Sequence, residues 1–178
     1  MKQTLSIEEI LVYTNLAFNQ FTEGIKQKDE AIFFRALHEN TWSIAQHIQH
    51  LIIATRTTTA AYALPKFVVR FVGGRPNRPS YSYDVLVEKY LDAIRNGGKA
   101  TGRYIPKKNT SLISKEKIIN NWQRTSITYL KAVKKNWTTE QLDKYSVKHS
   151  LLGMITLREL CYFTIYHTQH HLAGINKR

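Results

Sequence analysis

Three of the seven histidines in this 178-residue chain lie within one short stretch near its C-terminal end. His167 and His171 are four residues apart, which places them about 40° apart around a helix with about 3.6 residues per turn. Two imidazoles on one helical face can reach the same metal ion. His170 lies roughly 100° from His171 on the same geometry, so we expect it on a flank of the helix. The stretch therefore predicts a metal site built on a helix.

A third histidine is expected from the segment 41–64, which contains His47 and His50. Three neutral imidazoles suit Zn²⁺, Ni²⁺ or Fe²⁺ and leave a coordination position for water, which favours a catalytic site over a closed structural one. Histidines that only make hydrogen bonds in the core remain an alternative. The periodicity alone leaves the choice of the third ligand open, because the apolar stripe of the segment lies nearer His47 than His50; this stripe consists of Ile44, Ile48, Leu51 and Thr55.

Other common chemistries are not indicated by the sequence. A zinc-protease HExxH motif is excluded, because Thr168 stands where that motif requires glutamate. Cys161 lies roughly 120° from His167 around the helix, and a buried, inert thiol is the usual state of a free cysteine. The chain contains neither a glycine-rich phosphate loop nor a nucleophile elbow, so we interpret Gly73-Gly74 as a turn.

The charge of the chain is strongly basic and unevenly distributed. Residues 1–64 contain five Lys/Arg and six Asp/Glu, for a net charge of −1, whereas residues 65–178 contain 21 and seven, for a net charge of +14. Such a surface attracts anions, including nucleic acid, anionic membrane or an anionic small molecule. We do not expect nucleic acid as a partner, because no zinc-finger, RNP-like or KH-type signature is present.

Length and composition favour one globular domain that covers residues 1–178. No apolar run approaches the ~20 residues of a membrane span, so we expect no membrane association. The N-terminal residues are not those of a signal peptide, and the single cysteine fits a reducing compartment. We therefore expect a cytoplasmic protein.

Helical periodicity dominates the chain, and no strand-like alternation of useful length is found. We predict an all-α fold, a four-helix bundle with one extra inserted helix. The second helix is expected to begin at a cap on Asn40 or Thr41 and to end before Pro65. The predicted bundle helices cover residues 6–27, 41–64, 114–136 and 156–176.

Residues 65–110 are expected to form an insertion between the second and third bundle helices. Residues 65–80 contain three of the four prolines and should form a loop with little regular structure in its second half. An added helix is predicted over 81–96, where it ends on Gly97-Gly98. The segment 146–152 is expected to be a loop.

Two parts of the sequence resemble one known family. The second helix contains Trp42-Ser43 followed by His50-Leu51, and the chain ends in HSLLGMITLRELCYFTIYHTQHHLAGI. Together these segments resemble the DinB/YfiT-like superfamily of metalloenzymes, with its "WS…HL" helix, its "LGxLTLRELL" approach and its terminal "HxxHHxxQI". The resemblance spans most of the chain and is weakest over residues 65–110.

The resemblance implies a metal-ligand set. By position, the family's ligands fall on His50, His167 and His171, which leaves His47 with a supporting or structural role. Gly174 stands where the family commonly has glutamine, a departure that could alter the surroundings of the last ligand.

The resemblance also implies a function. Relatives are often dimeric bundles in which a divalent metal activates a low-molecular-weight thiol for transfer or isomerisation. We therefore expect a homodimer that acts on a small electrophilic molecule as a metal-dependent, thiol-transferase-like enzyme. One alternative is a metal-dependent hydrolase that uses metal-bound hydroxide. The other is a stress-related binding protein without catalysis, whose basic surface meets an anionic partner.

Overall fold

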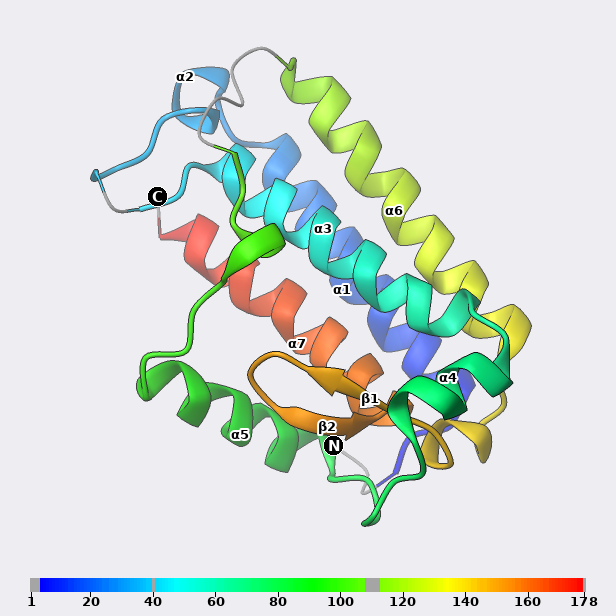
Figure 1. Cartoon of the computed structure of the whole chain (residues 1–178). Helices are drawn as coiled ribbons and strands as arrows, with labels where there is room; N and C mark the ends of the chain where they lie inside the picture. The colour runs from blue at the N-terminus through cyan, green and yellow to red at the C-terminus, as the bar shows by residue number, and fades with distance from the viewer. Residues whose placement is uncertain (1–3, 40, 108–112, 178) are drawn as a thin grey trace.

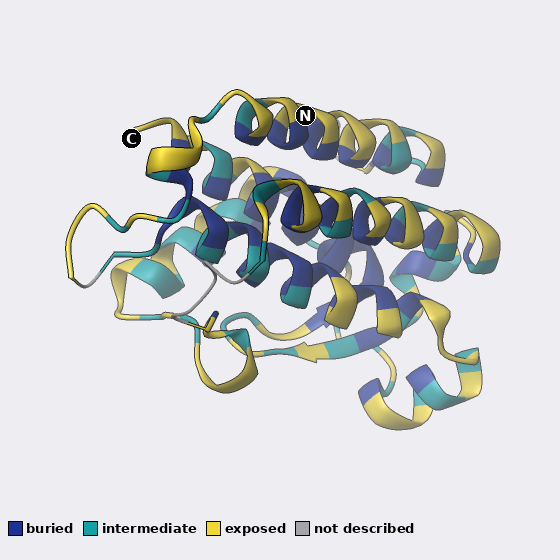
Figure 2. Ribbon diagram, turned by 90° about the horizontal axis from the view of Figure 1, so that it is seen from above, coloured by how far each residue is buried: buried dark blue, intermediate teal, exposed yellow. Residues whose placement is uncertain are grey.

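A computed structural model describes residues 4–39, 41–107 and 113–177 of the protein, and most of them are helical. Four long helices run alongside one another (Figure 1), and each buries the side that faces its neighbours (Figure 2). The predicted all-α bundle is confirmed. The bundle helices are α1 (Ile7–Lys26), α3 (Ile44–Ala63), α6 (Lys115–Asn136) and α7 (Leu157–Asn176).

The bundle helices begin at sequence-encoded caps. Three of them have a capping box, in which a hydroxyl accepts from the backbone N–H three residues later and the side chain there accepts in return. These boxes pair Ser6 with Glu9, Ser43 with Gln46, and Thr156 with Glu159. The fourth helix, α6, is capped by the Ser114 hydroxyl, which accepts from the N–H of Lys117.

The predicted start of the second helix is wrong by about one turn. The helix begins at Ile44 and its cap is Ser43, not Thr41, while Asn40 lies outside the described residues. The Ser43–Gln46 capping box fixes this start, and it leaves Trp42 outside the helix. Trp42 therefore precedes the helix, and its side chain packs on the histidine rings described below.

The bundle core is centred on Trp122 of α6, which is fully buried. Its ring meets Phe18 and Phe21 of α1 edge-to-face, each with 5.1 Å between ring centroids. The indole N–H donates to the Thr22 hydroxyl at 3.0 Å, so its one polar atom is satisfied. These contacts fix α6 against α1.

The insertion between α3 and α6 contains more structure than the sequence predicts. The expected helix is α5 (Tyr83–Arg95), and Gly97 follows it with φ +87°, as a C-terminal glycine requires. A further helix, α4 (Lys66–Gly73), occupies the first half of the expected loop 65–80. Two short 3₁₀ turns, η1 (Gly102–Tyr104) and η2 (Gln141–Asp143), and the one-turn α2 (Glu30–Phe33) complete the helical elements.

Residues 146–156 form a β-hairpin where a loop and no strand were expected. Strand β1 (Ser146–His149) pairs antiparallel with β2 (Gly153–Thr156), with Val147 opposite Ile155. So short a two-stranded hairpin is marginal by itself and needs packing from elsewhere, which explains why local periodicity does not reveal it.

The packing that stabilises the hairpin comes from the end of α4. The Ser146 hydroxyl donates to the backbone oxygen of Gly73 at 2.7 Å. The two backbones approach so closely that a Cβ on Gly73 would lie 1.6 Å from the Ser146 carbonyl oxygen, so only glycine fits. The Gly73 position that we interpreted as a turn is thus a helix end pressed against a strand.

Buried charges on the first turn of α7 connect distant segments. Glu159, which is fully buried, accepts from Arg78 and from the backbone N–H of Tyr81 at 2.7 Å. Arg158 forms an ion pair with Asp143 at 2.7 Å and donates to the Leu5 carbonyl oxygen. The insertion and the N-terminal segment are therefore both held to the start of α7.

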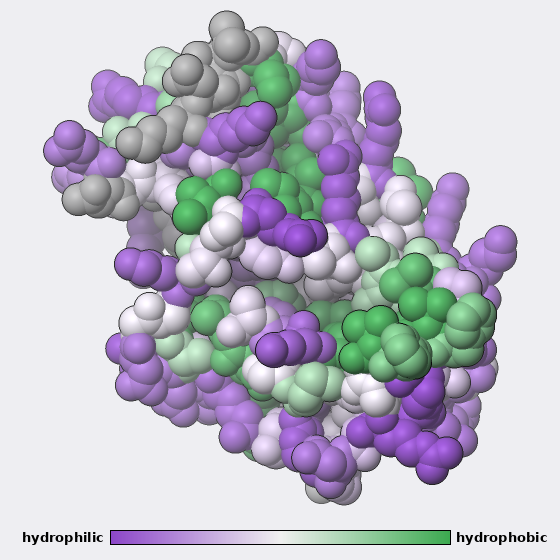
Figure 3. All heavy atoms as spheres, viewed as in Figure 1, coloured by the Kyte–Doolittle hydropathy of each residue, from purple (hydrophilic) through white to green (hydrophobic). Residues whose placement is uncertain are grey.

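One apolar helix face points to solvent. In Figure 3 a group of hydrophobic side chains lies over α4, where Phe67, Phe71 and Val72 are 75%, 90% and 76% exposed. Within the described residues, no helix has both the length and the apolar character that crossing a bilayer requires.

Core and surface aromatics should differ sharply in their contribution to stability. We expect Trp122→Ala to lower the free energy of unfolding by roughly 3–5 kcal/mol, because it leaves a cavity and removes the hydrogen bond to the Thr22 hydroxyl. Phe71→Ser should change it by less than about 0.5 kcal/mol. Urea denaturation of both variants tests this. A large loss in Phe71→Ser would mean that the α4 face is covered in solution.

Candidate metal centre

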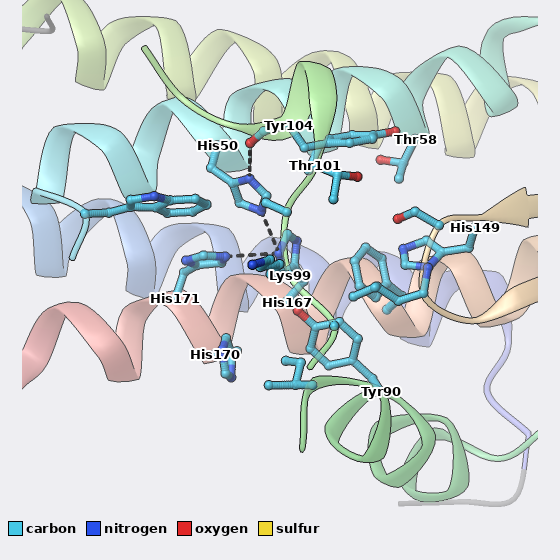
Figure 4. A pocket seen from close by; sticks show the side chains of 18 residues that line it. His50, Thr58, Tyr90, Lys99, Thr101, Tyr104, His149, His167, His170 and His171 are labelled. Atoms are coloured by element: carbon cyan, nitrogen blue, oxygen red, sulfur yellow. Dashed lines mark hydrogen bonds between the residues drawn. The ribbon is translucent and has the colours of Figure 1, made fainter. Parts of the chain in front are cut away.

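The structure brings together the three histidines that the sequence singles out. His50 from α3 and His167 and His171 from α7 are all buried, and their rings face one another (Figure 4). The Nε2 atoms of His50 and His167 are 3.1 Å apart, and those of His167 and His171 are 3.0 Å apart. Three imidazole nitrogens from two helices thus converge on one point.

Hydrogen bonding fixes which nitrogen of His50 faces that point. Its Nδ1 lies 2.7 Å from the backbone carbonyl oxygen of Tyr104, which can only accept. Nδ1 therefore bears the proton, and Nε2 presents its lone pair to the other two rings. Tyr104 belongs to η1, so a backbone group of the insertion orients a side chain of the bundle.

His47 lies beside His171 and contacts its outer nitrogen. Its Nδ1 lies 2.8 Å from Nδ1 of His171, on the side of that ring away from the cluster. When His171 donates to His47 through Nδ1, its Nε2 also has a free lone pair. An outer hydrogen bond of this kind is the usual means by which proteins orient a histidine ligand.

Aromatic rings confine the imidazoles. Trp42 stacks parallel to His171, with centroids 6.3 Å apart, and is tilted against His50 at 5.0 Å. Phe163 stacks on His167 at 4.7 Å. These contacts restrict ring rotation, so the three nitrogens remain directed at one another.

Burial keeps the cluster neutral. It lowers the pKa of His167 and His171 well below the usual histidine value, and the neighbouring imidazoles lower both further. Burial also lowers the pKa of His50, although the bond to the Tyr104 carbonyl opposes that change. Neutral imidazoles are the form that binds a metal ion.

The donor set fits a divalent cation. Nitrogens about 2.05 Å from one ion lie about 2.9 Å apart at right angles and about 3.35 Å apart in a tetrahedron. The two separations that involve Nε2 of His167 fall between these limits, and all three ligand atoms lie within 4.8 Å of one another. Without a cation, Nε2 of His167 has at most one proton to donate, so it cannot form a full hydrogen bond to both His50 and His171. A cation at the shared point would satisfy all three.

The cluster lies at one side of a pocket of about 180 Å³. Apolar side chains form much of its wall, among them Tyr90 and Ile94 of α5 and Phe163 of α7. Lys99, Thr101 and the η1 turn cover it from the insertion, and the hairpin contributes His149 to the far end (Figure 4). The insertion thus converts an exposed cluster into a chamber.

Two other candidates take the places that the sequence suggests. His170 lines the pocket but points away from the three converging rings (Figure 4). Cys161 is buried beside the Tyr62 hydroxyl at 2.9 Å, and burial raises the pKa of its thiol to about 11, so the thiol is inert.

Sequence reasoning missed the Tyr104 carbonyl and His149. A backbone carbonyl has no sequence signal at all. His149 precedes the turn at residues 150–152 as a single histidine, so only the hairpin, which periodicity does not reveal, brings it to the pocket.

Fold and site together define a helical bundle with a buried three-histidine cluster opening on a pocket. The family model of the DinB superfamily matches residues 14–175, so the chain belongs to that superfamily. The crystal structure of TT2238, a four-helix bundle protein, is similar over 97% of this chain and 99% of that one, with a TM-score of 0.59 and 14% identity, which shows a shared fold. No curated protein sequence matches.

The support from His47 should be measurable as metal affinity. We expect His47→Ala to weaken metal binding roughly 10- to 100-fold, because the His171 ring loses its hydrogen-bond partner. His47→Asn is the matched control, since its side-chain oxygen can accept in place of Nδ1. Competition with a chromogenic chelator measures both. Equal affinity in the wild type and His47→Ala would remove His47 from the site.

The buried histidines should also make stability depend on pH. Their folded-state pKa values are lowered, so the stability they permit is complete above the unfolded value of about 6.5 and is lost as pH falls below it. We expect the free energy of unfolding of the metal-free protein to fall between about pH 7 and pH 5. Urea denaturation at several pH values measures the slope.

The matched control for this pH dependence removes the groups that titrate. The double variant His167→Leu/His171→Leu should show a shallower slope over the same range, because neither side chain takes up a proton on unfolding. Identical slopes in the two proteins would show that the cluster is already protonated or solvated in the folded state.

Proposed function

We propose that the protein is a metal-dependent enzyme with His50, His167 and His171 as its metal ligands. The observation that supports this proposal is the convergence of three neutral imidazole nitrogens beside a pocket. A closed structural site would commonly have four protein ligands, often thiolates. The only cysteine in the chain is Cys161, which is buried against Tyr62.

The reaction class that we propose is transfer of a low-molecular-weight thiol to a small electrophile. A divalent ion bound by the three histidines would act as a Lewis acid and lower the pKa of a thiol or water that reaches it. Trp42 and Phe163 hold the ligand rings in place, so little reorganisation is needed when substrate enters. The apolar wall formed by Tyr90 and Ile94 excludes water from the reacting groups.

The charge distribution supports an anionic thiol. Lys99 lines the pocket and is exposed, so its ammonium group can meet a carboxylate at the entrance. The C-terminal two-thirds of the chain supplies the net positive charge that attracts anions to this region. These two features favour a thiol carrying carboxylates over a neutral one.

Removal of one ligand tests the metal assignment. We expect His171→Ala, made without a histidine tag, to lose bound metal, whereas His170→Ala should retain it because that ring points away. Both should stay folded, since the four helices bury enough apolar surface without the ion. Elemental analysis and thermal unfolding decide. Unfolding of His171→Ala at room temperature would make the metal structural.

Activity tests the reaction class. A panel of low-molecular-weight thiols is assayed with an aryl halide, from which the thiolate displaces halide as the C–S bond forms. We expect turnover by the wild type and His170→Ala and none by His171→Ala. Ester hydrolysis without thiol would instead indicate a hydrolase. A metal-free protein that binds nucleic acid in a salt-sensitive way would indicate a binding function.

A further inference from the structure

His149 is a polar side chain in the pocket that the metal centre does not use. It is the last residue of β1 and lines the end of the pocket away from His171 (Figure 4). Its ring meets Phe163 edge-to-face, with 4.3 Å between ring centroids, and Phe163 stacks on His167 at 4.7 Å. One aromatic side chain therefore contacts both His149 and the histidine cluster.

The hairpin turn fixes the tautomer of this ring. Nδ1 of His149 accepts the backbone N–H groups of Leu151 and Leu152, each at 3.2 Å. A nitrogen that accepts two hydrogen bonds bears no proton, so the proton of the neutral ring lies on Nε2. Burial lowers the pKa of His149 to about 4, so the ring stays neutral near pH 7.

The remaining N–H is free to meet a ligand. The two ring nitrogens point in nearly opposite directions, so Nε2 is directed away from the turn while the ring lines the pocket. Among the residues that the structure describes, none forms a hydrogen bond with this Nε2. A neutral donor with one fixed direction therefore faces a mostly apolar chamber.

We propose that His149 Nε2–H is the hydrogen-bond donor that binds the substrate's carbonyl-type oxygen, and that the substrate class is compact, largely apolar carbonyl compounds. This inference rests on the proposed function, because it names the electrophile for that site. A neutral N–H pairs with a carbonyl oxygen and leaves an ammonium group, which can only donate, without a partner, so it discriminates between them. The apolar surfaces of Ile94, Leu151 and Phe163 suit the rest of such a molecule.

Two substitutions separate the donor from the turn. In His149→Asn the side-chain oxygen occupies the place of Nδ1, so it can still accept from Leu151 and Leu152 while the donor is lost. In His149→Gln the side-chain amide N–H₂ approaches the place of Nε2, so a donor is restored. The probes are acetophenone and ethylbenzene, which differ by one carbonyl oxygen in place of the two hydrogens of a CH₂ group.

Affinities are measured from amide chemical shifts, on the protein as purified and again after chelation of metal. We expect His149→Asn to bind acetophenone roughly fivefold more weakly than the wild type, ethylbenzene binding to be unchanged, and His149→Gln to recover most of the loss. Wild-type affinity for acetophenone in the Asn variant, or no acetophenone binding by the wild type, would overturn the proposal.

A second measurement does not depend on any variant folding. Histidine side-chain ¹⁵N spectra of the wild type should show the Nε2–H form of His149, and its Nε2–H proton should shift with acetophenone but not with ethylbenzene. An Nδ1–H form, or equal shifts with both probes, would overturn the proposal. If the protein binds metal but shows neither the weaker acetophenone binding nor the Nε2–H shift, the donor role of His149 is wrong and the proposed metal enzyme is unaffected. If both effects occur but the protein binds no metal, the donor role is supported and the proposed metal enzyme is wrong.

Discussion

The burial of α7 is the constraint on which the rest of the structure depends. Helices α1, α3 and α5 all pack against it, so most of its side chains lose contact with water, charged ones included. A buried polar group is costly unless it is paired. Arg158 and Glu159 therefore require partners, and they find them in η2, the N-terminal segment and the insertion. The hydrogen bonds of Arg158 and Glu159 thus fix the positions of these three segments relative to α7.

The same constraint gives the histidines their chemistry. His167 and His171 lie one turn apart in the C-terminal half of α7, where burial disfavours their charged forms. Neutral rings have one lone pair each, and the partners of the outer nitrogens decide where it points. The Tyr104 carbonyl does this for His50 and the His47 ring does it for His171. These outer hydrogen bonds direct the Nε2 lone pairs of His50 and His171 towards Nε2 of His167.

The insertion therefore belongs to the site as much as the bundle does. Its Arg78 is fixed to Glu159, the residue that also caps α7, so the position of the insertion follows from the helix start. From that point the chain passes through α5 and η1 to cover the histidines. The family resemblance in the sequence is weakest over this segment, although the segment supplies part of the pocket wall and the Tyr104 carbonyl that binds His50.

The sequence predicts features that depend on residues close together in the chain and misses those that depend on residues far apart. Capping boxes at Ser6 and Thr156 and the four-residue spacing of His167 and His171 are local, so helix starts and the helical face of the site are predictable. The choice of His50 over His47 depends on the family resemblance, because the apolar stripe of the helix lies nearer His47. The hairpin depends on contact with Gly73, more than 70 residues away, so no local pattern signals it.

The placement of polar groups around the pocket argues for binding over stability. Three buried imidazole nitrogens within 4.8 Å of one another disfavour the folded state relative to apolar side chains of similar volume, because each must be desolvated and cannot be fully paired without a cation. His149 is similar, since its Nδ1 is satisfied by the turn, while its Nε2 forms no hydrogen bond with the described residues and the ring lines the pocket. Phe163 packs on both His149 and His167, and so fixes the spacing between an electron-pair donor set and a proton donor. A ligand that receives a metal ion's polarisation on one side and a hydrogen bond on the other would be held in one orientation, which a chamber of apolar walls alone could not achieve.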